Sequence, residues 1–499
     1  MPHVNARVGK YRRGSIAALS ACAACIAVAA SSAHAAPIPA TGTVADGQDR
    51  SQATPGVTPD PTRSTTAPPS IQNPSAPTSP PPRSGLFPTA GADLLSHGID
   101  VHGIAFDHYL ANPSAGIVTG RSSNLGVLAP AIDVDLEKLA GLRGSNFHVQ
   151  ATFFGLQRDI PGIITQAGGF LTGFQTTPAP VPNVLSVLTF EQKLVGGRLS
   201  IEVGRSNIYR NFLLSNSLDV FTSFSSTLEV DGDFNSPPYP VWSARAAYRI
   251  DRAWYVQGGV FEDNYRHASA NGNDFSTDGA SGAAILAEVG YRTEFDTAAR
   301  PGNFEVGVEV NTRHGYSNIK GTGADATPRN TAADYPGGGV LFAQGAKVVW
   351  RGTRRPYGPP ANIAPYGSID IALGSPQPIE LDAIAGLNVT GFIPGRPFDA
   401  LGLQAHYQRL SAIEASAESR AQVLTDGPGR LQPRGGLAFE TVANIQVTKA
   451  FAVRPIAQYF VDPDAYYLPA QARPHDGFEL SVFAVLSLGR LLGTSQKPF

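Results

Sequence analysis

Charged and amide side chains recur at every second position in several segments of this chain. In 241–250, VWSARAAYRI, Arg245 and Arg249 alternate with apolar residues, and Gln257 follows in 254–262. Such alternation is typical of a strand with one apolar and one polar face. Guanidinium, carboxylate and amide groups on one polar face could hold hydroxyl-bearing ligands, several of them through charge-assisted hydrogen bonds.

The same alternation predicts which other polar residues share this face. They are Glu191, Glu202, Arg245, Arg249, Gln257, Glu288, Arg292, Glu305, Glu309, Lys347, Asp370, Asn388, Gln404, His406, Glu440, Asn444, Arg454 and Gln458. Both signs of charge are present, which suits a neutral polyol, whereas a uniformly basic ring would favour anions. For each residue the alternative is a solvated charge with no specific role.

The hairpin 242–260 allows two interpretations of the fold. Trp242, Tyr248 and Trp254 lie near strand ends on its apolar face. A soluble sandwich would bury that face. A membrane barrel would turn it to lipid, with aromatic rings at headgroup level and the arginines in a wet lumen.

The strand pattern continues to Leu488 and predicts about sixteen strands. They lie near 98–110, 124–136, 145–156, 184–193, 198–206, 241–250, 254–262, 283–295, 304–313, 340–350, 364–373, 383–393, 400–410, 435–448, 450–461 and 477–488. Most have about ten residues, the length that a tilted strand needs to cross a bilayer. Sixteen strands would enclose an aqueous channel.

The connections between these strands alternate in length. The long ones are 111–123, 157–183, 207–240, 263–282, 314–339, 411–434 and 462–476, and the intervening turns are shorter. On the long side, only the connection after 364–373 is short. Short turns on one side and long loops on the other are typical of outer-membrane barrels. We therefore predict an all-β fold, a transmembrane antiparallel β-barrel with both termini on the periplasmic side.

The bulk composition agrees with a barrel. Charged residues are 16% and hydrophobic residues 42% of 499 residues, and the formal net charge is −2. Low charge content without long apolar runs fits apolar residues spread one in two. A near-neutral chain gives no bulk attraction for nucleic acid, which we do not expect as a partner.

Three regions follow from composition. Residues 1–35 have a basic start, an apolar core and the A-x-A site Ala33-His34-Ala35, so we expect a cleaved signal peptide. A membrane anchor helix and a lipoprotein signal before Cys22 are the alternatives. Residues 36–84 are rich in Pro, Ser and Thr, and this composition predicts a disordered linker. Residues 85–499 are predicted to form the barrel. Cys22 and Cys25 are the two cysteines, so the mature chain would have no thiol.

The chain resembles the carbohydrate-selective porins of the OprB type. The resemblance rests on 135–144 followed by Phe147-His148, on 190–192 and 197–205 with Phe212, on Pro238-Tyr239-Pro240, and on 254–257 and 259–261. It implies an outer-membrane porin that passes monosaccharides and small oligosaccharides, as a homotrimer or a monomer, in contact with lipid and lipopolysaccharide. The linker and the tail 489–499, with Phe499 after Pro498, depart from the family pattern.

We assign seven candidate substrate-binding residues at a pore constriction: Glu191, Glu202, Arg205, Arg245, Gln257, Glu288 and Glu309. Arg205 lies at a strand end, at a position that the alternation assigns to the apolar face. It matches a motif position of the family that the chain resembles. His102 and His108 share a face but are more simply polar lining than a metal site. No cofactor is expected.

Two other functions stay open. An outer-membrane barrel enzyme would need a Ser/His or Asp/His constellation, and the sequence has no G-x-S-x-G beside a strand-to-helix pattern, no H-E-x-x-H and no P-loop. A non-specific general porin would share the barrel but would show no block of ion current by glucose.

Overall fold

The computed structural model describes residues 84–158, 182–212, 239–264, 271–313, 320–322, 328–330, 337–355, 357–374, 377–426, 431–466, 468–469 and 473–495. All described residues belong to one compact unit, Pro61–Phe499. The expected signal peptide lies outside the described residues, as does the expected linker except for Ser84.

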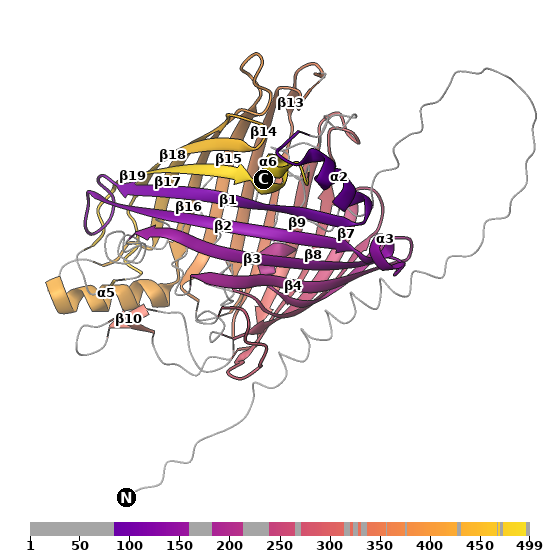
Figure 1. Cartoon of the computed structure of the whole chain (residues 1–499). Coiled ribbons are helices and arrows are strands. Elements are labelled where there is room, and N and C mark those ends of the chain that lie inside the picture. The colour runs from indigo at the N-terminus through magenta and orange to yellow at the C-terminus, as the bar shows by residue number, and fades with distance from the viewer. Residues whose placement is uncertain are drawn as a thin grey trace, which may run out of the picture. The chain divides into compact units, whose positions relative to one another are not determined.

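One large antiparallel sheet forms the wall of this unit (Figure 1). Its strands are β1 (Ile99–Asn112), β2 (Arg121–Asp135), β3 (Ser145–Arg158), β4 (Asn183–Leu194), β5 (Leu199–Ser206), β6 (Val241–Arg249), β7 (Trp254–Asp263), β8 (Gly282–Arg292), β9 (Gly302–Asn311), β12 (Gly339–Lys347), β13 (Trp350–Arg351), β14 (Asn362–Ala372), β15 (Ile379–Thr390), β16 (Ala400–Leu410), β17 (Gly435–Gln446), β18 (Phe451–Val461) and β19 (Gly477–Ser487). The two-residue β13 follows β12 along β14, so the wall has sixteen strands. Because β1 pairs with both β2 and β19, the sheet closes on itself. The predicted sixteen-stranded barrel is confirmed.

The first long connection is shorter than the sequence pattern predicted, because β1 and β2 both extend towards it. The Asn112 side chain donates to the carbonyls of Ala115 and Val118 and accepts from the Arg121 N–H. These bonds close the loop and keep the polar start of β2 in register with the end of β1. Polar residues beside a turn do not alternate with apolar ones, so the sequence pattern did not assign these strand ends to β1 and β2.

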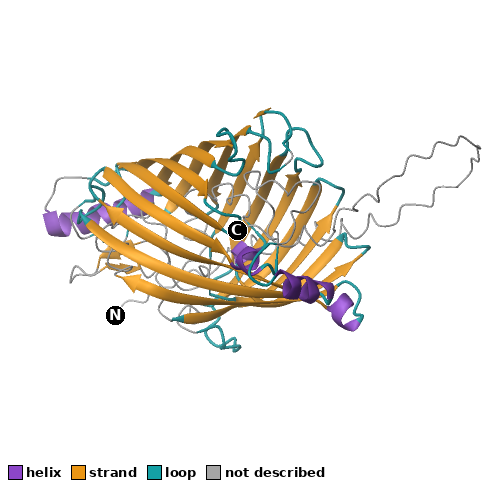
Figure 2. Ribbon diagram, turned by 45° about the horizontal axis from the view of Figure 1, so that its top comes forward, coloured by secondary structure: helices purple, strands orange, loops and turns teal. Residues whose placement is uncertain are grey.

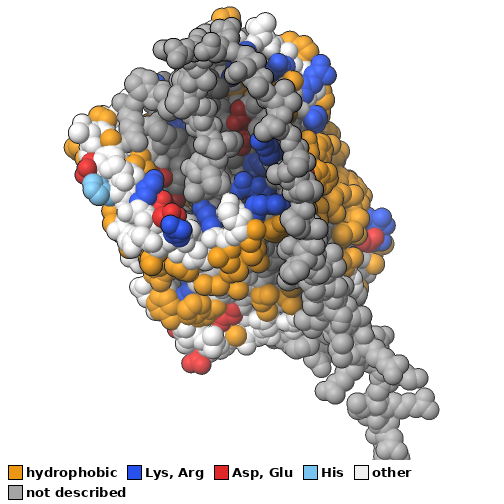
Figure 3. Space-filling model, turned by 90° about the vertical axis from the view of Figure 1, so that its right-hand side faces the viewer, with side chains coloured by type: hydrophobic (Ala, Val, Ile, Leu, Met, Phe, Trp, Pro, Cys, Tyr) orange, Lys and Arg blue, Asp and Glu red, His pale blue; other side chains and the backbone are white. Residues whose placement is uncertain are grey.

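The two faces of the wall differ in chemistry as predicted. Trp254 and Val306 are 46% and 55% exposed on the outside, whereas Glu191 and Glu309 are 1% and 0% exposed on the inside. Figure 3 shows charged side chains inside the rim of the hollow end and hydrophobic side chains on the wall outside it. Apolar side chains turned outward and polar ones turned inward are the arrangement of a barrel that crosses lipid.

Lys347 is the member of the predicted polar face that lies on the other side of the wall. In β12 the buried positions are Phe342, Gln344 and Ala346, so Lys347 has the outward parity of Leu341. The prediction failed because the lumenal face of β12 carries the apolar Val340, Phe342 and Ala346 beside Gln344, so alternation gives little direction.

The start and the end of the described chain, residues 84–96 and 488–495, lie together on the short-turn side. The helix α2 (Pro88–Ser96) precedes β1, and α6 (Leu488–Leu492) follows β19 at once. The N–H groups of Leu86 and Phe87 donate to the carbonyls of Leu491 and Leu492 at 2.9 and 2.7 Å. The start and the tail of the described chain are therefore hydrogen-bonded to each other, beside the turn that carries α3 (Leu136–Ala140) (Figure 2).

The long connections lie at the other end. There α5 (Ala412–Asp426) packs through Ala415 against Leu410, Ile379 and Tyr466. The 3₁₀ turn η3 (Ile208–Arg210) and the small ribbon of β10 (Lys320–Thr322) and β11 (Pro328–Asn330) belong to other connections. None of the described helices is long and apolar enough to span a membrane.

Glu418 of α5 is fully buried and accepts a hydrogen bond from the Ala465 N–H at 3.0 Å. Burial raises the pKa of Glu418 well above its usual range, and the nearby Asp464 and Glu414 carboxyls raise it further. Glu418 thus retains its proton more readily than an exposed glutamate.

We expect deletion of residues 36–84, with the signal kept, to leave barrel assembly and conductance intact. A segment that is disordered, as its composition predicts, would contribute no contacts to the wall. Heat-modifiable migration on gels and single-channel conductance measure the two properties. Loss of folded protein after this deletion would show that the segment is structural.

Candidate functional site in the barrel lumen

Neighbouring strands place most of the candidate residues in one inclined row inside the barrel. Glu191 of β4 lies opposite Glu202 of β5, and Glu202 lies opposite Arg245 of β6. Gln257 of β7 lies opposite Glu288 of β8. Directly opposite side chains on one face of an antiparallel sheet have Cβ atoms about 5 Å apart, close enough to interact. The sheet register therefore brings five of the seven candidates together.

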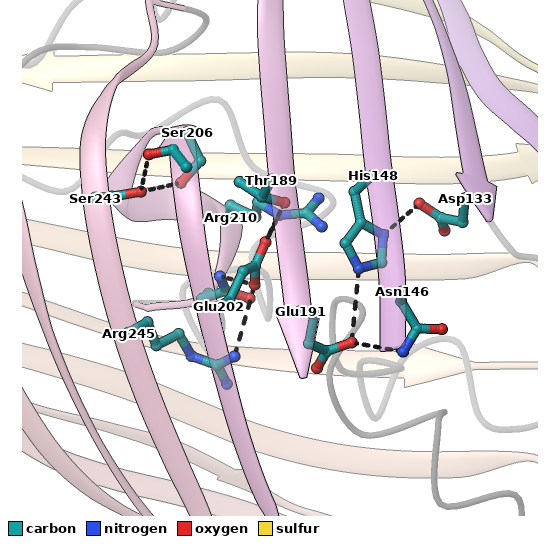
Figure 4. A network of polar contacts seen from close by, with 12 residues as sticks. Asp133, Asn146, His148, Thr189, Glu191, Glu202, Ser206, Arg210, Ser243 and Arg245 are labelled. Atoms are coloured by element: carbon teal, nitrogen blue, oxygen red, sulfur yellow. Dashed lines mark hydrogen bonds and ion pairs between the residues drawn. The ribbon is translucent and has the colours of Figure 1, made fainter. Parts of the chain in front are cut away.

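Glu202 is the centre of this row (Figure 4). Its carboxylate accepts hydrogen bonds from Thr189 Oγ1 at 2.6 Å, from Arg210 Nε at 2.7 Å and from Asn211 Nδ2 at 2.9 Å. Arg245 Nη1 lies 3.8 Å from the same carboxylate. One buried carboxylate thus holds two guanidinium groups, and both of them lie in the lumen.

Arg210 and Asn211 come from the connection after β5, which turns into the barrel. The Phe212 ring that follows is fully buried and meets Phe261 edge-on, with ring centroids 5.8 Å apart. It packs in an apolar patch on the inner wall, made of Ile208, Phe212, Val241, Phe261, Ala284, Leu286, Val340 and Phe342. The Phe212 ring lies so close to Gly259 that a Cβ there would come within 2.9 Å of it. The first residues of this connection therefore narrow the lumen.

The charge of Arg210 is secured by its partner. Burial lowers the pKa of Arg210, but the Glu202, Asp133 and Glu191 carboxylates together raise it by more, so the pKa lies above the ordinary arginine value. Arg210 and Asn211 are not among the residues predicted from the sequence, because a connection has no alternation from which the direction of a side chain can be inferred.

The row continues across β7, β8 and β9. Arg245 Nε donates to Gln257 Oε1 at 2.7 Å, and Gln257 Nε2 donates to the Asn211 carbonyl at 2.8 Å and to Glu288. The Tyr255 hydroxyl joins Glu288 at 3.3 Å to Glu305 at 3.1 Å. Gln257 therefore links the inward-turned connection to the wall.

Glu191 anchors the other end of the row. Ser200 Oγ donates to Glu191 at 2.6 Å, and Lys193 Nζ and His148 Nε2 lie 3.5 and 3.6 Å from it. The other ring nitrogen of His148 lies 2.7 Å from Asp133, whose second oxygen lies 3.0 Å from His102. Asp133 and His148 were not selected from the sequence, although both lie on predicted strands.

Arg205 and Glu309 lie away from this row. Arg205 Nη2 donates to the Pro240 carbonyl at 2.8 Å, and its guanidinium lies 5.2 Å from the centroid of the Phe275 ring. Its register partner is the outward-facing Trp242. Glu309 lies fully buried in the lumen, opposite Leu286 and Val340 of the apolar patch. The assignment of either residue to a constriction stays a prediction.

The row offers hydrogen-bond donors and acceptors of both charges within a wet channel. Guanidinium and amide groups donate, and carboxylates accept, so a ligand that both donates and accepts is matched. Among the described residues, no group of three or more His, Cys, Asp or Glu could hold a metal ion.

A closed antiparallel barrel with an apolar outer wall and a charged lumen defines an outer-membrane channel of the porin class, not an enzyme. Residues 120–478 match the family described as "Carbohydrate-selective porin, OprB family", and the chain belongs to this family. It resides in the outer membrane of the Gram-negative type. No curated protein sequence matches the chain.

A solved structure of Pseudomonas putida OprB shares the fold. The high-pH structure of Pseudomonas putida OprB has a TM-score of 0.65 at 16% identity, and covers 81% of this chain and 99% of that chain. The low-pH structure of the same protein has a TM-score of 0.46 at 15% identity, and the match covers 81% of this chain and 100% of that chain. OmpT of Vibrio cholerae has a TM-score of 0.44 at 9% identity, and the match covers 78% of this chain and 97% of that chain.

Proposed function

We propose that this porin gives passive, carbohydrate-selective diffusion of monosaccharides and small oligosaccharides across the outer membrane. The proposal rests on the row of lumenal side chains around Glu202, which comprises Glu191, Glu202, Arg245, Gln257 and Glu288 and is called the Glu202 row below. Two guanidinium groups, an amide and several carboxylates project from adjacent strands and from the inward-turned connection into one lumenal region. The family to which the chain belongs is described as carbohydrate-selective, which supports the same substrate class.

The row matches the chemistry of a sugar. Each hydroxyl of a neutral polyol donates to a carboxylate and accepts from a guanidinium or an amide. In a wet pore each hydrogen bond contributes on the order of 1 kcal/mol net. Binding through a few such bonds is weak, and weak binding lets a solute leave as readily as it enters.

Within this function we assign Glu191, Glu202, Arg245, Gln257 and Glu288 to the constriction, with Arg205 and Glu309 as outlying candidates. The partners would be small sugars in the lumen, and lipid and lipopolysaccharide around the outer wall. The signal peptide at 1–35 would direct export.

We expect Arg245→Ala to raise ion conductance and to weaken current block by glucose about tenfold, since about 1.4 kcal/mol corresponds to a factor of ten. The change removes both the donor to Gln257 and a partner of Glu202. Planar-bilayer recording measures block, and liposome swelling with glucose measures flux.

Glu191→Gln is the matched comparison for this experiment. The amide retains hydrogen-bonding capacity but loses the charge, so ion selectivity should change more than glucose affinity. If Arg245→Ala alters neither conductance nor block, the row is not the constriction. A wild-type channel that glucose does not block at all would be a general porin.

A further inference from the structure

A second row of polar side chains lies on the opposite side of the lumen. Gln404 of β16, Glu440 of β17, Gln458 of β18 and Glu479 of β19 are consecutive register partners, one on each strand. The Tyr366 hydroxyl donates to Gln404 Oε1 at 2.8 Å, and Gln458 Nε2 donates to Glu440 at 2.8 Å. Around the sixteen-stranded wall, β17 lies eight strands from β6, which carries Arg245.

This second row has hydrogen-bonding capacity that the described residues do not use. Glu479 is 1% exposed, and neither of its carboxylate oxygens has a hydrogen-bond partner among the described residues. Gln404 Nε2 and Ser481 Oγ also have none within that part of the chain. A buried polar group without a partner is costly, so a ligand that completes its hydrogen bonds would be held there.

Glu479 points into the lumen and not into lipid. Its chain neighbours Phe478 and Leu480 are 49% and 44% exposed on the outer wall, and successive side chains of a strand point to opposite faces. Glu479 is the third residue of β19, counted from the end at the long connections. A solute that enters from that end would reach Glu479 early.

The charge of the second row differs from that of the Glu202 row. No arginine or lysine belongs to it, and the basic residue on the lumenal face of β18, Arg454, donates to Asn444 at 2.9 Å. The carboxylates of this row repel anions and accept hydrogen bonds from hydroxyl donors. Gln404 Nε2 supplies the complementary donor.

Aromatic side chains lie in the same part of the wall. Tyr366 and Phe460 belong to one buried apolar cluster with Ala438 and Ile384. Ligand sites commonly combine such apolar surface with a few placed polar groups. An uncharged sugar ring, with apolar C–H faces and polar hydroxyls at its edge, matches this combination.

We propose that Gln404, Glu440, Gln458 and Glu479 form a second polyol-binding subsite, which takes an uncharged hexose on the wall opposite the Glu202 row. The inference rests on the proposed function, because it assigns a further site for the same class of solute. A solute released from this subsite would diffuse through the lumen towards the Glu202 row.

The test is single-channel recording of current fluctuations with glucose and maltose in the wild type, Glu479→Ala and Glu479→Gln. We expect Glu479→Ala to weaken sugar affinity at least fivefold and Glu479→Gln to weaken it less, since the amide retains one acceptor oxygen. Thr441→Ala is the control, because Thr441 is an exposed outer-wall neighbour of Glu440 and should leave sugar affinity unchanged. Heat-modifiable migration checks that each variant is folded, and the near-isosteric glutamine keeps the test informative if the alanine variant does not assemble.

The outcomes separate the two proposals. Sugar affinity unchanged in both Glu479 variants, with only the reversal potential shifted, would mean that the carboxylate merely attracts cations, and would overturn the subsite. If Arg245→Ala weakens sugar block in the same recordings, the proposed function stands while the second subsite falls. A wild-type channel without sugar binding overturns both.

Discussion

Replacing Ala246 with arginine is expected to prevent most of the protein from folding into a bilayer. Ala246 lies on the outer face of β6, in register with Ile201 and Gly258, and Ile201 is exposed on that face. An arginine on the lipid face near the bilayer midplane costs about 2–4 kcal/mol, a large part of the stability of an ordinary domain. The yield of heat-modifiable protein in lipid vesicles measures the effect.

The neighbouring residue provides the matched control. Ala247 has the opposite parity and lies between Ser200 and Gln257 in register, on the lumenal face. An arginine there remains hydrated, so Ala247→Arg should assemble at close to the wild-type yield. Equal yields for the two variants would show that the assignment of the faces of β6 is incorrect.

Replacing Glu202 with alanine is expected to change the channel more than any other single lumenal substitution. Arg210 and Asn211 would lose the acceptor that holds the inward-turned connection, and Arg245 would lose its nearby carboxylate. Breaking a buried ion pair costs about 3–5 kcal/mol, because the remaining charge is left without a partner. We expect a larger conductance, with selectivity shifted towards anions because one negative charge is removed.

Conductance and reversal potential in a salt gradient measure these two effects. Glu202→Gln is the comparison, because the amide oxygen accepts from Thr189 or Arg210 while the charge is lost. It should reproduce the shift in selectivity with a smaller rise in conductance. An unchanged conductance in Glu202→Ala would mean that Phe212 packing alone holds the connection in the lumen.

The sequence predicts the wall of this protein better than its interior. A strand between lipid and water must alternate, and a closed barrel must sort its connections by length, so both patterns are visible in one sequence. The outward Trp242 and Trp254 and the lumenal Glu191 and Gln257 follow from parity alone. The register that places Glu202 opposite Arg245 comes from the structure, because the long connection between β5 and β6 does not fix it.

What fills the lumen could not be predicted in the same way. Arg210 and Phe212 lie in a connection, where direction is set by tertiary contacts and not by period. The apolar patch that receives Phe212 also removes the in-out contrast from β12, and Lys347 was assigned to the wrong face for that reason. Asp133 and His148 are joined by a contact between strands that neither segment reveals alone.

The pairing of β1 with β19 gives the chain the topology of a ring. Ile104 and Ser487 are register partners although 383 positions separate them in the sequence, and the backbone bond from Leu86 to Leu491 spans a similar interval. Contacts at such separation carry a large loop-closure entropy and make folding slow. Until β19 arrives, β1 and β18 are open edges that can pair with strands of other chains. The barrel can therefore aggregate through its open edges until the last tenth of the polypeptide has paired. A cell that makes it must shield these two edges until synthesis and export are complete.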